Sequence, residues 1–318
     1  MKVISDAAEL QPGPRPVCAA IGVFDGVHLG HQHVLRQTIS DAARHQAVSA
    51  VVTFDRHPNA VVAPANVPPL IYPLAKKLEV IASFGVEAAY VIRFDKAFSQ
   101  ISGEEFVRGL ARDFKRMASL CVGDGFMFGA RRSGNVALLQ KLGGELGFTL
   151  HALRDVELDG QSVSSTRIRD AVRAGDFALA GRMLGRPHAL CGSVIHGDHL
   201  GRKFGFPTAN LDITGLLVPL TGVYAAEAHV GATHWRAAVN IGHRPTIHSA
   251  DPQLHVEAHL LDFDGDLYGQ ALELVFLKKL REEKKFPTTE ALKAQIAWDI
   301  QQARNIRAPT GAEPSVQG

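Results

Sequence analysis

The succession of apolar runs and helical patterns changes near residue 185, and this change limits the folds open to the chain. Before it, apolar runs of strand length alternate with helical patterns, the clearest of which follows the capping box Ser102-x-x-Glu105. The runs are mostly continuous, as burial on both faces of a parallel sheet requires. They are Val17–Ile21, Val48–Phe54, Ala88–Phe94, Ala118–Val122 and Phe148–Ala152. We therefore predict a doubly wound, Rossmann-like α/β domain over residues 1–185.

After Gly185-Arg186-Pro187, strand-length runs follow one another with turn residues and no helical pattern between them. The candidates are Leu190–Ile195, Val223–Val230, Trp235–Ile241, Leu254–Leu261 and Ala271–Leu277. Successive strands without helices predict an antiparallel sheet or closed barrel, here over residues 186–306. Pro287 begins a last helix whose apolar face is expected to pack on the barrel. Residues 307–318 lack apolar periodicity, so we expect a disordered tail.

Charge and composition argue against several classes of partner. The 318 residues carry a net charge of +2 and 7% aromatic side chains, which favours neither nucleic acid nor an anionic membrane. No apolar run approaches the roughly 18 residues of a membrane span, and the start of the chain has no signal-peptide core. Cys18, Cys121 and Cys191 fit neither a disulfide framework nor a zinc pattern. We expect a cytoplasmic protein with small-molecule substrates and no obligate protein partner.

A glycine-rich turn joins the first predicted strand to the first helix. It reads Gly-Val-Phe-Asp-Gly-Val-His-Leu-Gly-His over residues 22–31 and lies where open α/β sheets bind ligands. Its glycines let the backbone approach a phosphate, and His28 and His31 can donate to phosphate oxygens. No Gly-Lys-Ser/Thr occurs, so the turn is not a Walker A loop. Two alternatives remain: a zinc site that includes His33, and a purely structural turn.

A cluster of hydroxyls opens a second predicted helix: Ser164, Ser165 and Thr166 precede Arg167. Hydroxyls at a helix start most often cap the helix. Three together with an arginine can instead hold the β- and γ-phosphates of a nucleotide. Beside the upstream turn, we favour phosphate binding.

A second glycine-rich loop precedes Pro207-Thr208-Ala209-Asn210. Thr208 and Asn210 lie two apart on an extended segment, so they face one side and offer the oxygen ligands of a magnesium–phosphate site. The alternative is an ordinary glycine-rich turn between strands. In the run 255–259, Glu257 shares a strand face with two histidines. This trio is compatible with a metal site, a solvated sheet face, or a carboxylate base directed at a substrate hydroxyl.

Together these segments resemble the bacterial bifunctional riboflavin kinase/FMN adenylyltransferase family, also called FAD synthetases. The matching segments, in the family's order, are G-V-F-D-G-V-H-L-G-H at 22–31, S-S-T-R-I-R at 164–169, G-D-H-L-G-R-K-F-G-F-P-T-A-N-L at 197–211, N-I-G-H-R-P-T at 240–246, V-E-A-H-L-L-D-F-D-G-D-L-Y-G at 256–269 and R-E-E-K-K-F-P at 281–287. The resemblance implies a nucleotidyltransferase-like domain followed by a six-stranded riboflavin kinase barrel. It also implies phosphorylation of riboflavin to FMN with ATP, then adenylylation of FMN to FAD and pyrophosphate, with Mg²⁺ as cofactor.

The resemblance also implies roles for single residues. Glu257 would take the proton from the ribityl 5′-hydroxyl, Thr208 and Asn210 would hold Mg²⁺ and ATP, and His28 and His31 would stabilise the α-phosphate that FMN attacks. Binding of ATP or its phosphates would involve Gly22, Phe24, Asp25, Gly26, Gly30, Ser164, Ser165, Thr166, Arg167, Gly197, Lys203 and Thr208. The flavin would lie near Asp124, Asn210 and Arg281.

Three positions depart from the family's usual pattern. Gly125 stands where an acid or amide is usual, Met127 where arginine is frequent, and Arg56 where proline is usual. Because Gly125 removes a polar group expected near the flavin nucleotide, we expect adenylylation to be weaker than phosphorylation. The alternatives are a riboflavin kinase with a weak or inactive first domain, and a non-catalytic flavin-binding protein. The intact histidines of the turn and Glu257 favour catalysis.

Overall fold

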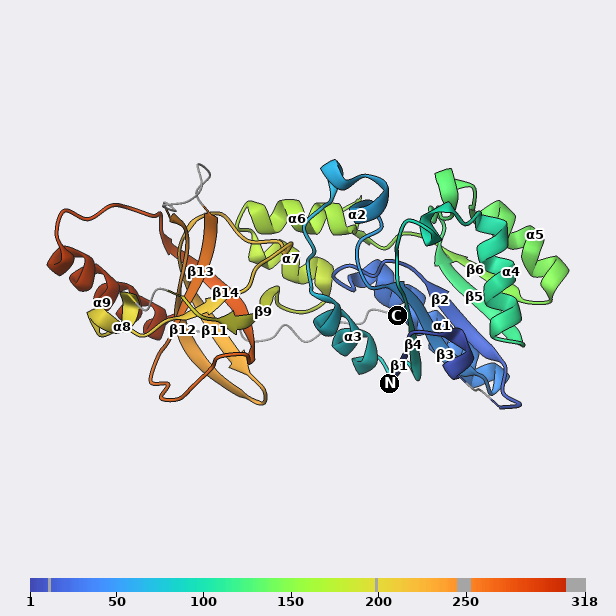
Figure 1. Cartoon of the computed structure of the whole chain (residues 1–318), viewed down its shortest axis with the longest axis horizontal. Helices are drawn as coiled ribbons and strands as arrows, with labels where there is room; N and C mark the ends of the chain where they lie inside the picture. Colours follow the sequence, from blue (N-terminus) through green and yellow to red (C-terminus); the bar gives the residue numbers. More distant parts are fainter. Residues whose placement is uncertain (11–12, 198–199, 245–252, 307–318) are drawn as a thin grey trace. The chain divides into compact units, whose positions relative to one another are not determined.

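A boundary at residue 165 divides the chain into two units, residues 1–165 and 166–318. In this computed structural model the described residues are 1–10, 13–197, 200–244 and 253–306 (Figure 1). The expected disordered tail, residues 307–318, lies outside them. No helix among the described residues is long and apolar enough to cross a membrane.

The first unit is built on a six-stranded parallel sheet with the strand order β1-β4-β3-β2-β5-β6. Its strands are β1 (Lys2–Ile4), β2 (Val17–Ile21), β3 (Val48–Phe54), β4 (Ala88–Ile92), β5 (Met117–Gly123) and β6 (Thr149–Leu153), with a small hairpin of β7 (Glu157–Leu158) and β8 (Gln161–Ser162). Its helices are α1 (Leu29–His45), α2 (Asn59–Val62), α3 (Leu74–Ser83), α4 (Gly103–Asp113) and α5 (Val136–Leu146), with short 3-10 turns η1 (Ala7–Leu10), η2 (Pro64–Asn66), η3 (Phe98–Gln100) and η4 (Ala130–Arg132). The predicted doubly wound α/β domain is thereby confirmed.

Alternate residues of the central strands face opposite layers of helices. Ala20 of β2 belongs to the apolar cluster that contains Leu35 of α1 and Ile81 of α3. Its neighbour Ala19 belongs to the cluster on the other face, with Leu110 of α4 and Leu142 of α5. Because both faces of the sheet are covered, its strands are apolar at almost every position.

The strand order turns back at β2. The sheet continues through β3 and β4 on one side of β2, and through β5 and β6 on the other. In doubly wound sheets, ligands bind in the crevice at the carboxyl ends of the strands next to such a point. The turn over residues 22–31 follows β2, and the segment that begins at Asp124 follows β5. Both segments therefore start at this crevice.

The second unit contains a closed antiparallel barrel of six strands, in the order β10-β13-β12-β11-β14-β9. They are β9 (Ala189–Ile195), β10 (Ala209–Leu211), β11 (Gly222–Val230), β12 (Thr233–Arg244), β13 (Gln253–Leu260) and β14 (Ala271–Arg281). The remaining helices of the chain are α6 (Ser165–Arg173), α7 (Phe177–Leu184), α8 (Leu200–Phe204) and α9 (Thr289–Asn305). α9 packs against β11, β12 and β14 (Figure 1). The barrel and its final helix are confirmed.

Phe177 of α7 packs against the core of the barrel, and His188, in the segment between α7 and β9, packs against Phe177. Phe177 of α7 stacks on Phe276 with ring centroids 5.2 Å apart, stacks on His188 at 6.3 Å and meets Tyr224 edge-on. His188 is buried, and among the described residues neither of its ring nitrogens has a hydrogen-bond partner. Burial, with a smaller contribution from the charge of Arg186, lowers the pKa of His188 to about 4. His188 is therefore a neutral imidazole inside the second unit.

We expect His188 to make the second unit less stable in acid. The unfolded chain binds a proton near the ordinary histidine pKa of 6.5, whereas the folded protein binds it only near 4. The contribution to stability is therefore fully present above pH 6.5 and is lost as the pH falls toward 4, by about 3 kcal/mol in all. Urea titrations should show that the free energy of unfolding of His188→Phe falls by about 3 kcal/mol less than that of wild type between pH 7 and 4. The exposed His234→Phe serves as the control, and equal pH dependence in all three proteins would contradict the prediction.

Candidate active sites

The turn over residues 22–31 has a strained backbone that is held by burial. Phe24 and Val27 adopt left-handed φ values of 53° and 42°, which cost energy in any residue with a side chain, most of all in a β-branched one. Both side chains are almost completely buried, in one apolar cluster with Leu35. At Gly26, with φ at 79°, a Cβ would lie 2.9 Å from a methyl carbon of Ile71. The packing of its side chains and the close contact at Gly26 therefore hold the turn in this backbone conformation.

Hydrogen bonds to Asp25 fix the turn from two more directions. The buried Asp25 carboxylate accepts from the amides of Ile71, at 3.0 Å, and Tyr72, at 3.4 Å. The carbonyl oxygen of Asp25 accepts from the hydroxyl of Ser165, at 2.9 Å. Ser165 thus lies at the turn, although it is 140 residues away in sequence. Of the hydroxyl cluster, Ser164 also belongs to the first unit, whereas Thr166 and Arg167 belong to the second.

The two histidines of the turn form a stacked pair at the start of α1. Their rings lie 3.7 Å apart with an angle of 22° between the planes. His28 is the N-cap of α1, and its Nδ1 accepts from the backbone N–H of His31 at 3.4 Å. An accepting Nδ1 places the imidazole proton on Nε2, so His28 presents a donor. Together with the amino-terminal end of a 17-residue helix, the pair is suited to an anion.

The segment after β5 starts at the same crevice and carries Asp124, one of the residues predicted near the flavin. Asp124 is exposed, and the neighbouring Phe126 stacks on Phe128 with ring centroids 5.2 Å apart. A Cβ at Gly125 would meet nothing within 4 Å, so the space beside that backbone is open. A larger side chain would therefore fit at this position. At Arg56, another of the three departures, the side chain forms an ion pair with Asp55, at 2.9 Å.

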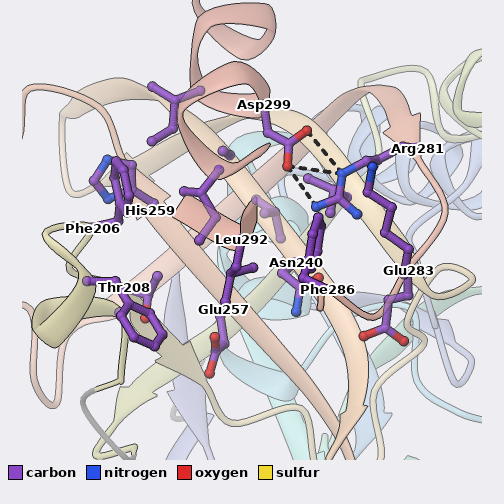
Figure 2. Close-up of a pocket in the computed structure, with 18 residues that line it drawn as sticks. Phe206, Thr208, Asn240, Glu257, His259, Arg281, Glu283, Phe286, Leu292 and Asp299 are labelled. Carbon is purple, nitrogen blue, oxygen red and sulfur yellow. Dashed lines mark hydrogen bonds and ion pairs between the residues drawn. The ribbon is translucent and has the colours of Figure 1, made fainter. Parts of the chain in front are cut away.

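The barrel holds a cavity of about 370 Å³ between its strands, α9 and the loop after β14 (Figure 2). Glu257 of β13 lines it and is half-buried. Strand register places Asn210 of β10 opposite Glu257 on one side and Asn240 of β12 opposite it on the other. Residues directly opposite on paired strands have Cβ atoms roughly 5 Å apart. The predicted base and the predicted metal ligand are thus neighbours. Asn240, which begins the segment 240–246 but received no predicted role, completes the row.

The glycines of the second loop leave room for the side chains they contact. A Cβ at Gly197 would lie 2.4 Å from the amide nitrogen of Asn210. A Cβ at Gly201 would lie 2.4 Å from the carbonyl oxygen of Phe206 and 3.0 Å from the hydroxyl of Thr208. A larger residue at either position would displace the Asn210 side chain or the backbone at Phe206, which explains the glycines at 197 and 201.

Thr208 lines two hollows of the second unit. One is the cavity that Glu257 lines, and the other is a groove of about 520 Å³ lined by Arg202, residues 264–267 of the loop between β13 and β14, and Tyr268. Pro207 also lines the groove, and its carbonyl oxygen lies 2.7 Å from Nδ1 of His259, which lines the cavity. A ligand in each hollow would meet at Thr208. Lys203 lies exposed on α8.

Arg281, predicted near the flavin, closes one wall of the cavity (Figure 2). Its Nε and Nη2 donate to the buried carboxylate of Asp299 on α9, at 3.1 and 2.8 Å. Gln295 donates to the same carboxylate, at 2.9 Å, and the guanidinium lies 5.6 Å from the ring centre of Phe286. The charge of Arg281 is thereby neutralised, and the pair ties β14 to α9.

No group of three or more histidine, cysteine, aspartate or glutamate side chains that is arranged to hold a metal occurs in the part of the chain that the structure describes. This finding argues against the zinc alternative at the turn and the metal alternative around Glu257. A magnesium site built from a hydroxyl, an amide oxygen and phosphate oxygens would not be such a group.

Comparisons with known proteins cover both units. A family model described as FAD synthetase matches residues 10–167, and one described as riboflavin kinase matches residues 184–307. The bifunctional riboflavin kinase/FMN adenylyltransferase of Pseudomonas fluorescens is 41% identical, over 98% of this chain and 99% of its own. The proteins of the same name from Escherichia coli K12 and Bacillus subtilis are 39% and 36% identical, over 96% and 89% of this chain and 98% and 90% of their own.

A solved structure from Streptococcus pneumoniae is similar over 96% of this chain and 99% of its own, with a TM-score of 0.79 and 26% identity. Its title names a macrolide-efflux protein, whereas the relatives with higher identity carry the enzyme name. The higher identity over nearly the full length decides between the two names. The chain therefore belongs to the family of bifunctional riboflavin kinase/FMN adenylyltransferases.

Proposed function

We propose that this protein phosphorylates riboflavin to FMN in its second unit and adenylylates FMN to FAD in its first. The observation that carries the proposal is the meeting of two hollows at Thr208, with Glu257 lining one of them and Asn210 opposite it in the strand register. A kinase must bind a hydroxyl substrate and a nucleotide side by side, so that the hydroxyl reaches the terminal phosphate. Two hollows that share a lining residue suit this requirement. As functional regions we propose residues 1–185 for adenylylation and 186–306 for phosphorylation.

For phosphorylation, we place riboflavin in the cavity and ATP in the groove. The Glu257 carboxylate takes the proton of the ribityl 5′-hydroxyl. At the same time the hydroxyl oxygen attacks the γ-phosphate of ATP, and ADP leaves. The neutral Arg281–Asp299 pair and the ring of Phe286 form a wall that suits the largely apolar, aromatic flavin ring. Acid–base help supplies about 10²–10⁴-fold, whereas enzymes commonly accelerate reactions at least about 10⁶-fold. Positioning at the junction therefore accounts for much of the rate.

Mg²⁺ fits this junction. The Thr208 hydroxyl and the Asn210 amide oxygen are oxygen ligands of the kind that Mg²⁺ prefers, and the bare backbones of Gly197 and Gly201 leave both side chains room. When bound, the ion neutralises charge on the phosphates. We also place Gly197 and Lys203 among the residues that approach the phosphates.

For adenylylation, a phosphate oxygen of FMN attacks the α-phosphate of ATP, and pyrophosphate leaves. His28 and His31 stabilise the charge that grows on the α-phosphate, which lies at the start of α1. Gly22, Phe24, Asp25, Gly26 and Gly30 shape the turn that receives it.

Ser164 and Ser165 would hold the leaving pyrophosphate, a role supported by the contact of Ser165 with the turn. For Thr166 and Arg167 the same role is based on the sequence motif. Asp124 would contact the flavin nucleotide. We propose that adenylylation is the weaker activity, because the open space at Gly125 lacks a polar partner.

We further propose a cytoplasmic location. Cys18, Cys121 and Cys191 are buried and are not joined in disulfides, as expected of a protein from a compartment in which thiols stay reduced. Riboflavin, FMN and ATP are the proposed small-molecule substrates.

Product analysis tests the function directly. Incubation of the protein with riboflavin, ATP and Mg²⁺ should give FMN and then FAD, and excess chelator should stop FMN formation. FMN without FAD would support the kinase-only alternative. If neither FMN nor FAD forms, both enzymatic hypotheses are contradicted and the flavin-binding alternative remains.

Removal of the proposed base should separate the two reactions. Glu257→Gln keeps the shape of the side chain but cannot accept the proton, so we expect kcat for FMN formation to fall about 10²–10⁴-fold. FAD formation from added FMN should stay unchanged. Glu290→Gln, which alters an exposed carboxylate of α9, is the control. Loss of both activities in Glu257→Gln would contradict this division.

The turn histidines should matter only for the second reaction. His31→Ala removes one of the stacked imidazoles, and we expect kcat for FAD formation from FMN to fall about 10²–10³-fold. FMN formation from riboflavin should persist. His33→Ala, at an exposed position on the same helix, should leave both rates near those of wild type. An unchanged rate of adenylylation in His31→Ala would remove the proposed role.

A further inference from the structure

A buried lysine joins the ends of two central strands in the first unit. Lys77 of α3 is 7% exposed. Its Nζ lies 3.2 Å from the carbonyl oxygen of Val23, 3.1 Å from the hydroxyl of Thr53 and 3.0 Å from the carbonyl oxygen of Phe54. Val23 lies two residues after the end of β2, and Phe54 is the last residue of β3. One amine therefore bridges the carboxyl ends of neighbouring strands beside the proposed nucleotide site.

The hydrogen bonds around Lys77 require the charged ammonium. Thr53 donates its own hydroxyl proton to the carbonyl of Val23, at 3.2 Å, so its oxygen is left to accept from Lys77. The three partners of Nζ are then all acceptors, and an ammonium has three protons to donate. Burial lowers the pKa of Lys77 to about 8, while the charges of Asp25 and Asp55 oppose that shift. The ammonium is the main form at neutral pH.

The charged groups around Lys77 have other partners. The Asp25 carboxylate is bound to the amides of Ile71 and Tyr72. The Asp55 carboxylate pairs with Arg56 and accepts from the amide of Phe94, both at 2.9 Å.

His57 and Tyr72 complete the titratable and charged side chains that line the small hollow at Lys77. The bonds that Lys77 donates go to strand ends instead of to a carboxylate. Burying a charge costs free energy, and two carbonyls and a hydroxyl serve here as its partners.

We propose that Lys77 is a positioning residue for adenylyl transfer. Its ammonium fixes the backbone carbonyls of Val23 and Phe54 relative to one another. This contact also fixes the relative position of the turn 22–31, which follows β2, and the segment 55–58, which follows β3. Misplacement of reacting groups by about 1 Å can cost about 10²-fold in rate. The inference rests on the proposed adenylylation, and it adds a residue that touches neither substrate.

The pH dependence of activity and of stability separates this role from a merely structural one. Between pH 8 and 10.5 the folded protein loses the Lys77 proton while the unfolded chain still holds it, so the contribution of Lys77 to stability rises with pH. A neutral amine has one donor fewer for its three acceptors. Adenylylation should therefore fall as pH rises through about 8, while the stability contribution of Lys77 rises. If Lys77 acted on activity only through the stability of the fold, the rate of adenylylation and the stability contribution would change in the same direction with pH.

The test is Lys77→Met in the full-length protein, assayed with FMN and ATP and separately with riboflavin and ATP. Methionine keeps an unbranched apolar stem and removes all three bonds. We expect kcat for FAD formation to fall about 10²-fold, with FMN formation within about twofold of wild type. Lys76→Met is the matched control, because Lys76 is the neighbouring residue of α3 and pairs with Glu79 at 2.8 Å. It should change neither rate.

Two further measurements test the inference, and the first of them does not depend on the folding of Lys77→Met. Thr53→Val removes one acceptor, and its adenylylation should fall severalfold. The alkaline loss of adenylylation near pH 8 should be present in wild type and absent from the remaining activity of Lys77→Met. Unchanged adenylylation in either variant, or the same alkaline loss in both proteins, would overturn the inference. Wild type that forms no FAD would overturn the proposed adenylylation, and the inference with it.

Discussion

Both proposed sites depend on backbone that approaches its neighbours more closely than a Cβ atom would allow. In the first unit, Gly26 lies against Ile71, and the strained turn around it is held by the burial of its apolar side chains. In the second, Gly197 and Gly201 lie against Asn210 and Thr208. At each place the contact positions a polar side chain or a helix start. The glycines in the two motifs thus act through the residues they allow to come near.

Buried charges are stabilised differently in the two units, and the difference follows from what surrounds each charge. Asp25 is bound by backbone amides, and Lys77 by two carbonyls and a hydroxyl, because the ends of parallel strands and the loops after them expose such groups. In the barrel, antiparallel pairing satisfies most of the backbone. Arg281 and Asp299 therefore pair with one another, which ties the helix to the barrel. A buried pair is costly to break, since either partner alone leaves an unpaired charge.

Periodicity sufficed to predict both folds but not every element or site residue. β1 and β10 have three residues each, too few to show a pattern. Glu257 could be found from its strand face, whereas Asn240 lies beside it only through register, which depends on barrel closure. Lys77 had a signal that was missed: it follows Leu74 by three residues and precedes Ile81 by four, so it lies on the buried face of α3.

The different chemistry of the two nucleophiles explains why the two sites differ. The ribityl hydroxyl of riboflavin is a poor nucleophile while it keeps its proton, so the barrel offers a carboxylate beside the cavity. The phosphate of FMN is already anionic and needs no base. In the first unit the Asp25 carboxylate is accordingly bound to amides, and the groups at the turn are the histidine pair and the start of α1. The first reaction thus creates an anionic nucleophile, and the second site needs no base to activate it.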